Sequence, residues 1–246
     1  MAPRSSGKSP PVLVYSEPSA EVWHGDGVTA LRDKGDEPAD HLIIDPPYSQ
    51  HTHTNARRQV GSDGTKRGKQ DFGFDSLSSR VLADTCKIAA RVPGWSIVFC
   101  DDRGIDLWRR GLEGAGLEVV RVGVWVKENP MPQITGDRPA AGAEFIVIAH
   151  HPGRKKWNGG GRPGVWRAQV CKGGFHPTAK PLSLMRQIVR DFTQPGEEIL
   201  DLFAGGFTTI VAAKEEGRRG VGYDLSIGHC QTCLLYTSPS PRDVEE

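Results

Sequence analysis

Asp45, Pro46, Pro47 and Tyr48 follow a short apolar segment and combine residue types that can act on an aromatic amino group. The lone pair of such a group is delocalised into its ring, and two acceptors aimed at the N–H bonds can localise it. The Asp45 carboxylate and the Pro46 carbonyl are two such acceptors, and the prolines fix φ and bring no competing N–H. A preplaced carboxylate also stabilises charge that develops on the nitrogen, and Tyr48 offers a flat face to an extruded base. The alternative is a strand that ends in a simple proline turn.

Two further segments carry features of a ligand site. Residues 200–209 have the sequence LDLFAGGFTT between an expected strand and an expected helix, and Asp224 ends the next strand. Glycines let a ligand approach the backbone, and an acid at the neighbouring strand end can hold a ribose hydroxyl pair. A generic nucleotide site fits this pattern equally well. Residues 176–181, HPTAKP, form by themselves only a turn and a proline that begins a helix.

Together the three segments resemble the S-adenosylmethionine-dependent DNA amino-methyltransferases, in the circularly permuted order in which the catalytic motif precedes the cofactor motif. The resemblance runs from about residue 22 to residue 232 and implies a Rossmann-like α/β fold. It assigns catalysis to Asp45, Pro46, Pro47 and Tyr48. It also places Asp26 near the cofactor adenine, Lys180 near its methionine part and Asp224 on its ribose. The full set of implied cofactor contacts is Asp26, Lys180, Asp201, Phe203, Gly205, Gly206, Thr208, Thr209 and Asp224.

The activity that this resemblance implies is methyl transfer from S-adenosylmethionine to N6 of adenine in double-stranded DNA. Family members with Asp-Pro-Pro-Tyr favour adenine and those with Ser-Pro-Pro-Tyr favour N4 of cytosine, so a cytosine-N4 enzyme is the alternative. RNA or a protein amide is a further alternative substrate. We expect direct in-line transfer that requires no metal. We also expect no covalent intermediate, because no cysteine lies near the motif.

A non-enzymatic alternative is a nucleic-acid-binding module with a relic cofactor site. Its support is the expected damage to the C-terminus together with Phe207, which stands where the family has a glycine. If this position requires positive φ, a phenylalanine is strained there.

Alternating strand and helix signals predict a mostly parallel sheet with helices on both faces. The expected strands cover residues 21–24, 41–44, 95–100, 117–127, 145–149, 198–203 and 221–223. The expected helices cover residues 28–34, 77–92, 105–113 and 181–192, and a last one ends at residue 216. The Asp45 motif and the acidic residues then follow the carboxyl ends of strands, where ligands bind in open α/β sheets.

Composition fits one globular domain, expected over residues 12–232, because 37% of the 246 residues are hydrophobic and 25% are charged. The net charge of +1 is too low for a protein that binds nucleic acid by charge alone. Basic residues gather in two expected loops, 49–75 and 150–175, which we expect to contact DNA phosphates and take part in target recognition. The alternative is two solvated loops. The candidate DNA contacts are Arg57, Arg58, Arg154, Lys155, Lys156 and Arg167.

The two ends of the chain differ from its middle. Residues 1–11 are polar and lack the apolar core of a secretion signal, so we expect a flexible leader. The apolar runs are strand-sized and the five cysteines are scattered, which favours a cytoplasmic protein without a membrane span. The resemblance implies a prokaryotic or phage origin. Residues 233–246 continue no pattern and resemble a translated sequencing adapter, so we expect a non-native tail. The resemblance is compatible with a restriction endonuclease partner or with none, and it leaves the oligomeric state open.

Overall fold

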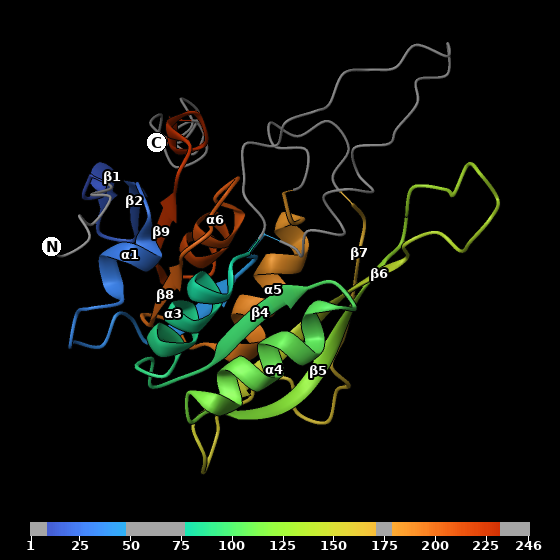
Figure 1. The fold of residues 1–246 in the computed structure, drawn as a ribbon, viewed down its shortest axis with the longest axis horizontal. Coiled ribbons are helices and arrows are strands. Elements are labelled where there is room, and N and C mark those ends of the chain that lie inside the picture. Colours follow the sequence, from blue (N-terminus) through green and yellow to red (C-terminus); the bar gives the residue numbers. More distant parts are fainter. Residues whose placement is uncertain (1–8, 48–76, 171–178, 232–246) are drawn as a thin grey trace, which may run out of the picture.

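The computed structural model describes residues 9–47, 77–170 and 179–231, which form a nine-stranded mixed sheet flanked by helices (Figure 1). The strand order is β1-β2-β9-β8-β3-β4-β6-β5-β7. The strands are β1 (Val12–Glu17), β2 (Ala20–His24), β3 (His41–Ile44), β4 (Ser96–Cys100), β5 (Glu118–Lys127), β6 (Ala143–His150), β7 (Val165–Ala168), β8 (Glu198–Asp201) and β9 (Arg219–Asp224). The helices are α1 (Gly27–Leu31), α3 (Ser79–Ala89), α4 (Gly104–Gly114), α5 (Leu182–Phe192) and α6 (Thr208–Glu215).

Five adjacent strands, β2, β9, β8, β3 and β4, run parallel to one another. Their carboxyl ends therefore meet at one edge of the sheet, here called the carboxyl edge, and the opposite edge is called the amino edge. Strand β6 runs antiparallel to both β4 and β5, so β5 and its parallel neighbour β7 again point toward the carboxyl edge. The expectation of a mostly parallel sheet is confirmed.

The helices cover the two faces of the sheet in two separate groups. Helices α1, α3 and α4 pack on one face, where Leu42 of β3 belongs to the core. Helices α5 and α6 pack on the other face, where the next residue, Ile43, belongs to a second core. Neighbouring strand residues point to opposite faces, and helices on both faces explain why all four residues of β3 are buried. The chain thus changes faces between β3 and β8, and such a switch point is where open α/β sheets bind ligands.

Two strands were not expected from the sequence. Strand β1 pairs antiparallel with β2 and is largely exposed, so its residues carry little hydrophobic alternation. Strand β7 lies within residues 150–175, which were expected to form a loop, and that expectation is wrong for this stretch. Trp166 and Ala168 are buried while Val165 and Arg167 are exposed, but four residues are too few for this alternation to stand out between glycines and prolines.

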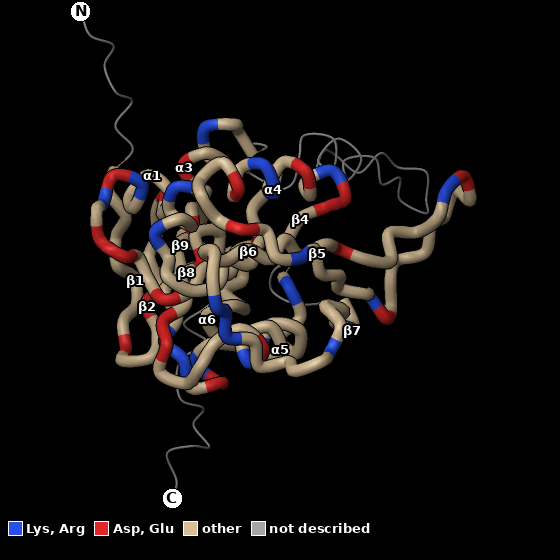
Figure 2. Tube along the Cα trace, turned by 90° about the horizontal axis from the view of Figure 1, so that it is seen from below, with Lys and Arg blue, Asp and Glu red and all other residues tan. Residues whose placement is uncertain are grey.

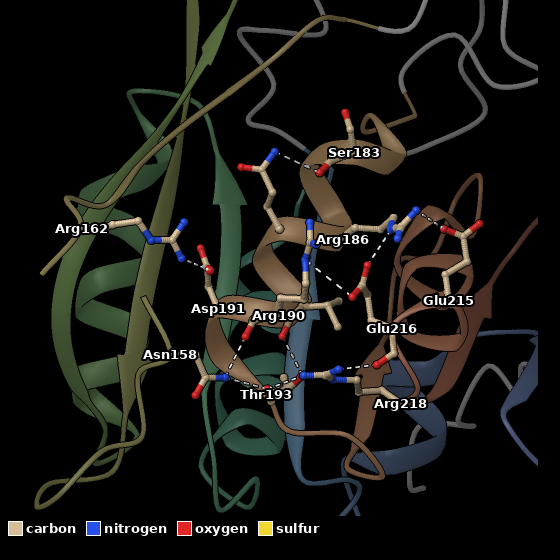
Figure 3. A network of polar contacts seen from close by, with 12 residues as sticks. Asn158, Arg162, Ser183, Arg186, Arg190, Asp191, Thr193, Glu215, Glu216 and Arg218 are labelled. Atoms are coloured by element: carbon tan, nitrogen blue, oxygen red, sulfur yellow. Dashed lines mark hydrogen bonds and ion pairs between the residues drawn. The ribbon is translucent and has the colours of Figure 1, made fainter. Parts of the chain in front are cut away.

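The segment between β6 and β7 is fastened to the end of α5 by a polar network (Figure 3). The Arg162 guanidinium bonds to the buried Asp191 carboxylate, which also accepts the Trp166 indole N–H at 2.9 Å. The Asn158 side-chain amide donates to the carbonyls of Arg190 and Thr193 at 2.7 and 2.9 Å. These bonds hold the C-terminal end of α5 at the amino edge. The N-terminal end of α5 therefore points to the carboxyl edge. Among the described residues, no helix is both long and apolar enough to cross a membrane.

Candidate active site

Five aspartates lie at the carboxyl edge, one at the end of each of the five parallel strands. Asp26 follows β2, Asp224 ends β9, Asp201 ends β8, Asp45 follows β3 and Asp101 follows β4. The strand register aligns these ends, since His24 pairs with Asp224 and Leu42 with Leu200. The structure thus brings together Asp26, Asp45, Asp201 and Asp224, four of the residues singled out in the sequence.

Asp26 is fixed in place because it caps helix α1. Its carboxylate accepts the Thr29 backbone N–H at 3.0 Å and the Thr29 hydroxyl at 2.8 Å. Gly27 follows, and a Cβ atom on this residue would lie 2.6 Å from Cγ of Tyr223. Only a glycine therefore lets α1 begin so close to β9. The Tyr223 ring in turn stacks on Trp23, with ring centroids 5.9 Å apart.

The glycine-rich turn between β8 and α6 is braced by two buried carboxylates. Asp201 accepts the Phe203 N–H at 3.0 Å, and Asp224 accepts the Gly205 N–H at 2.9 Å. Gly205 has φ of +51°, and a Cβ atom there would meet only the Phe203 carbonyl, at 3.8 Å. The two carboxylates therefore hold the turn on one side, while the side that a Gly205 Cβ atom would face is open, so a ligand can approach the backbone there. Thr209, also buried, bonds to Asp201.

Burial raises the pKa of Asp201 to about 7. The bonds from Thr209 and Phe203 lower this pKa, and the nearby carboxylates of Asp45 and Asp224 raise it, but burial is the largest effect. The folded state then holds this proton more tightly than the unfolded chain. The free energy of unfolding should therefore fall as pH rises from about 4 to about 7.

Asp201→Asn should remove this pH dependence. We expect its melting temperature, relative to the wild type, to rise between about pH 5 and about pH 8, because the variant has no carboxyl group to ionise. Thermal melts of both proteins across that range measure the effect. A constant difference between the two melting temperatures would contradict it.

Phe207 adopts the left-handed conformation, with φ of 56° and ψ of 21°. Its side chain is fully buried in a small core with Ala20, Val22 and Ile210. The sequence-based concern is thus confirmed for the backbone. The Phe207 ring, however, lies in the core and not on the open side of the turn. It does not block the approach of a cofactor, so Phe207 no longer favours a relic cofactor site.

Asp45 belongs to a chain of four alternating charges. The Lys180 ammonium bonds to Asp45 and lies 3.1 Å from Oε2 of Glu144, whose Oε1 lies 2.8 Å from the Lys127 ammonium. Burial alone would lower the pKa of Lys180, but Asp45 and Glu144 outweigh it and hold this pKa above its ordinary value. Lys180 was expected beside the methionine part of the cofactor; the structure places its ammonium on the catalytic candidate Asp45.

Glu144 and Lys127 were not among the residues expected at the site. They face each other across the β5–β6 hairpin, whose last pair is Val126 and Ala143. A lysine at the end of one expected strand and a glutamate at the start of the next is compatible with an ion pair across a hairpin. The sequence does not show that these strands pair antiparallel or that they lie beside β4, so it does not place the two residues at the site.

Cys100 ends β4, next to β3, and is therefore closer to Asp45 in space than the sequence indicates. Burial, together with the charges of Asp101 and Asp45, raises the pKa of its thiol to about 12. A thiol with this pKa is not a nucleophile near neutral pH, so the expectation that no covalent intermediate forms stays in place on chemical grounds.

The candidate DNA contacts are divided by the fold. Arg167 is exposed near the carboxyl end of β7, where it pairs with Val126 of β5. Arg154, Lys155 and Lys156 follow β6 at the amino edge, and Lys155 is bonded there to Glu118 at 2.7 Å. Around the described chain, basic and acidic residues are interspersed (Figure 2). Tyr48, Arg57 and Arg58 lie outside the described residues, as do residues 176–178 of the third motif.

A hollow of about 410 Å³ on the outer side of α5 is unrelated to these strand ends. It is lined by Asn158, Arg162, Gln187, Arg190 and Asp191. Asn158, Arg162 and Asp191 belong to the network of Figure 3 that anchors the β6–β7 segment. The hollow is therefore part of the scaffold.

The residues at the carboxyl edge fit S-adenosylmethionine. This cofactor presents hydrogen-bond donors and positive charge: an adenine amino group, ribose hydroxyls, an ammonium and a sulfonium. The edge presents the carboxylates of Asp26 and Asp224, and the open face of Gly205 leaves room against the backbone. Asp224 already accepts bonds from Gly205, Ser226 and His229, which leaves about one of its four acceptor positions for a ribose hydroxyl.

Comparison with known proteins defines the class. Residues 39–234 match the family described as DNA methylase, N6_N4_Mtase. The chain belongs to this family, the S-adenosylmethionine-dependent DNA amino-methyltransferases. It is 32% identical to the Type II methyltransferase M2.DpnII of Streptococcus pneumoniae, over 85% of this chain and 86% of that protein. It is 25% identical to the Type II methyltransferase M.HinfI of Haemophilus influenzae, over 91% of this chain and 70% of that protein.

Solved structures agree with this assignment. The M1.HpyAVI–SAM complex aligns with a TM-score of 0.65 and 26% identity, over 88% of this chain and 98% of that one. The cytosine-N4-specific PvuII DNA methyltransferase aligns with a TM-score of 0.71 over 92% of this chain and 89% of that one. At 13% identity this second likeness shows the fold alone. The expected Rossmann-like methyltransferase fold is confirmed, and with it an enzyme that uses S-adenosylmethionine.

Proposed function

We propose that this enzyme methylates N6 of adenine in double-stranded DNA, with Asp45 and Pro46 as the groups that orient and activate the amino nitrogen. The observation that carries the proposal is the position of Asp45, directly after β3 and beside the glycine-rich turn of β8. A carboxylate there can accept an N–H bond from a base that lies next to the cofactor site. The preference for adenine over N4 of cytosine rests on the Asp-Pro-Pro-Tyr form of the motif.

In this proposal, different residues bind the cofactor and orient the target base. When bound, S-adenosylmethionine supplies an electrophilic methyl group. Asp26, Gly205 and Asp224 hold the cofactor at the strand ends, on the β2–β9–β8 side of the switch point. Asp45 and the Pro46 carbonyl accept the two N–H bonds of the target, and Tyr48 stacks on the extruded base. The Asp45 carboxylate stabilises positive charge on the nitrogen during transfer.

Nucleoside mass spectrometry of duplex DNA methylated by the pure enzyme tests the choice of base. The proposal expects N6-methyladenine as the product. Finding only N4-methylcytosine would overturn the adenine assignment and leave the amino-group chemistry in place.

We further propose that Arg167 contacts the DNA backbone, because it is exposed at the same edge as Asp45. Arg167→Ala should weaken duplex binding several-fold and lower the slope of log affinity against log salt by about one. Arg154, Lys155 and Lys156 lie at the opposite edge, and the triple alanine variant should weaken binding less. Fluorescence anisotropy at several salt concentrations compares the two proteins. A larger loss for the triple variant would show that DNA crosses the amino edge.

A further inference from the structure

We propose that Glu144, oriented by Lys127, is a positioning residue that takes the Lys180 ammonium from Asp45 when the target amino group arrives. The inference deepens the proposed function and rests on it. None of the motifs found in the sequence includes Glu144 or Lys127.

The geometry places one ammonium between two carboxylates. The Lys180 side chain is 9% exposed and contacts both Asp45 and Glu144. Its Nζ also lies 5.3 Å from the centroid of the buried Phe99 ring. Lys180 can therefore shift between its two partners without entering water.

Glu144 is held in place from its other side. Its two oxygens are divided between the two lysines, with Oε2 toward Lys180 and Oε1 toward Lys127. The side chains of Glu144 and Lys127 are 15% and 17% exposed, and Lys127 also lies 5.3 Å from the Trp125 ring centroid. The carboxylate is thus fixed at the start of β6, facing Lys180.

Such a second partner answers a chemical requirement of the reaction. With Lys180 on Asp45, the carboxylate of Asp45 is neutralised and its acceptor positions are partly taken. An incoming amino group needs those positions, and the ammonium cannot be left buried without a counter-ion. Glu144 supplies the counter-ion, so the amino N–H replaces the ammonium on Asp45 while Lys180 stays paired.

The charge balance of the transfer points the same way. The nitrogen lone pair forms the new N–C bond and the electrons of the broken C–S bond return to sulfur. The nitrogen is positive until it passes one proton to the Asp45 carboxylate, which accepts its N–H bond, and from there to water. The four side chains Asp45, Lys180, Glu144 and Lys127 sum to zero charge. Removing Glu144 leaves an excess positive charge beside the reacting nitrogen, whereas removing Lys127 leaves an excess negative charge.

The two lysine–glutamate contacts therefore predict unequal effects. Glu144→Gln should lower kcat for tritium transfer from labelled S-adenosylmethionine to duplex DNA by about tenfold or more, with cofactor Kd within about twofold of the wild type. Lys127→Met should lower kcat by no more than about threefold, because the excess negative charge that it leaves does not oppose the positive charge on the nitrogen. Glu144→Asp, which restores the charge, should recover part of the loss.

Controls make each outcome decisive. Glu17→Gln breaks a comparable pair, in which Glu17 lies 2.8 Å from Lys214 at the amino edge, and should keep the wild-type kcat. Total methyl incorporation is counted whichever base is modified, so a wild-type enzyme that labels no DNA contradicts the proposed function and not this inference. The inference is overturned if Glu144→Gln keeps kcat within about twofold, or if Glu144→Gln and Lys127→Met lose turnover and cofactor affinity equally.

Discussion

Asp45→Asn is expected to lower kcat by about a thousandfold while leaving the affinity for S-adenosylmethionine within about threefold of the wild type. The substitution keeps the shape of the side chain and removes its charge, which stabilises the developing positive charge on the nitrogen. Lys180 keeps Glu144 as a partner at 3.1 Å, so the variant leaves no unpaired buried ammonium and should fold normally. The loss therefore reports on the chemical step.

Single-turnover methylation and isothermal titration with the cofactor separate the two quantities. Asp101→Asn is a matched control, because Asp101 follows the neighbouring strand β4 and its side chain accepts the Gly104 N–H at 2.8 Å at the start of α4. An asparagine can keep that bond, so this variant should retain its activity. If Asp45→Asn lost cofactor binding as severely as turnover, Asp45 would be a structural residue of the cofactor site.

The strand ends explain why much of this site could be predicted from the sequence. Each acid of interest follows a short apolar run, and parallel strands must bring their carboxyl ends to one edge. Asp26, Asp45, Asp201 and Asp224 therefore converge without knowledge of the strand order. The glycine-rich turn was predictable for a similar reason, since local backbone conformation determines it and Gly205 has positive φ.

Residues brought in by antiparallel pairing could not be placed in this way. Glu144 and Lys127 reach the site only because β6 turns back between β4 and β5. Lys155 shows the same limit: its sequence neighbours are basic, but β6 ends at the amino edge, where Lys155 pairs with Glu118. The local composition shows that residues 154–156 are basic. It does not show at which edge of the sheet they lie, because that depends on the direction of β6.

Phe207→Gly, which restores the glycine of the family motif, is expected to destabilise this protein by about 2–4 kcal/mol. The side chain is fully buried, and a Cβ atom on Gly222 would lie 2.9 Å from Cε1 of the Phe207 ring. The ring thus fills space that a glycine would leave empty. Relief of the left-handed backbone strain, worth about 1 kcal/mol, offsets only part of that loss.

The comparison with alanine separates these two contributions. Phe207→Ala creates nearly the same cavity and keeps a Cβ atom at φ of 56°, so it should be less stable than Phe207→Gly by about 1 kcal/mol. Urea denaturation of the three proteins measures both differences. A glycine variant as stable as the wild type would mean that the ring contributes nothing to the core. An alanine variant more stable than the glycine variant would mean that the backbone relaxes out of the left-handed conformation once the ring is gone, and that packing of Phe207 against Ile210 and Gly222 is what holds the turn in it.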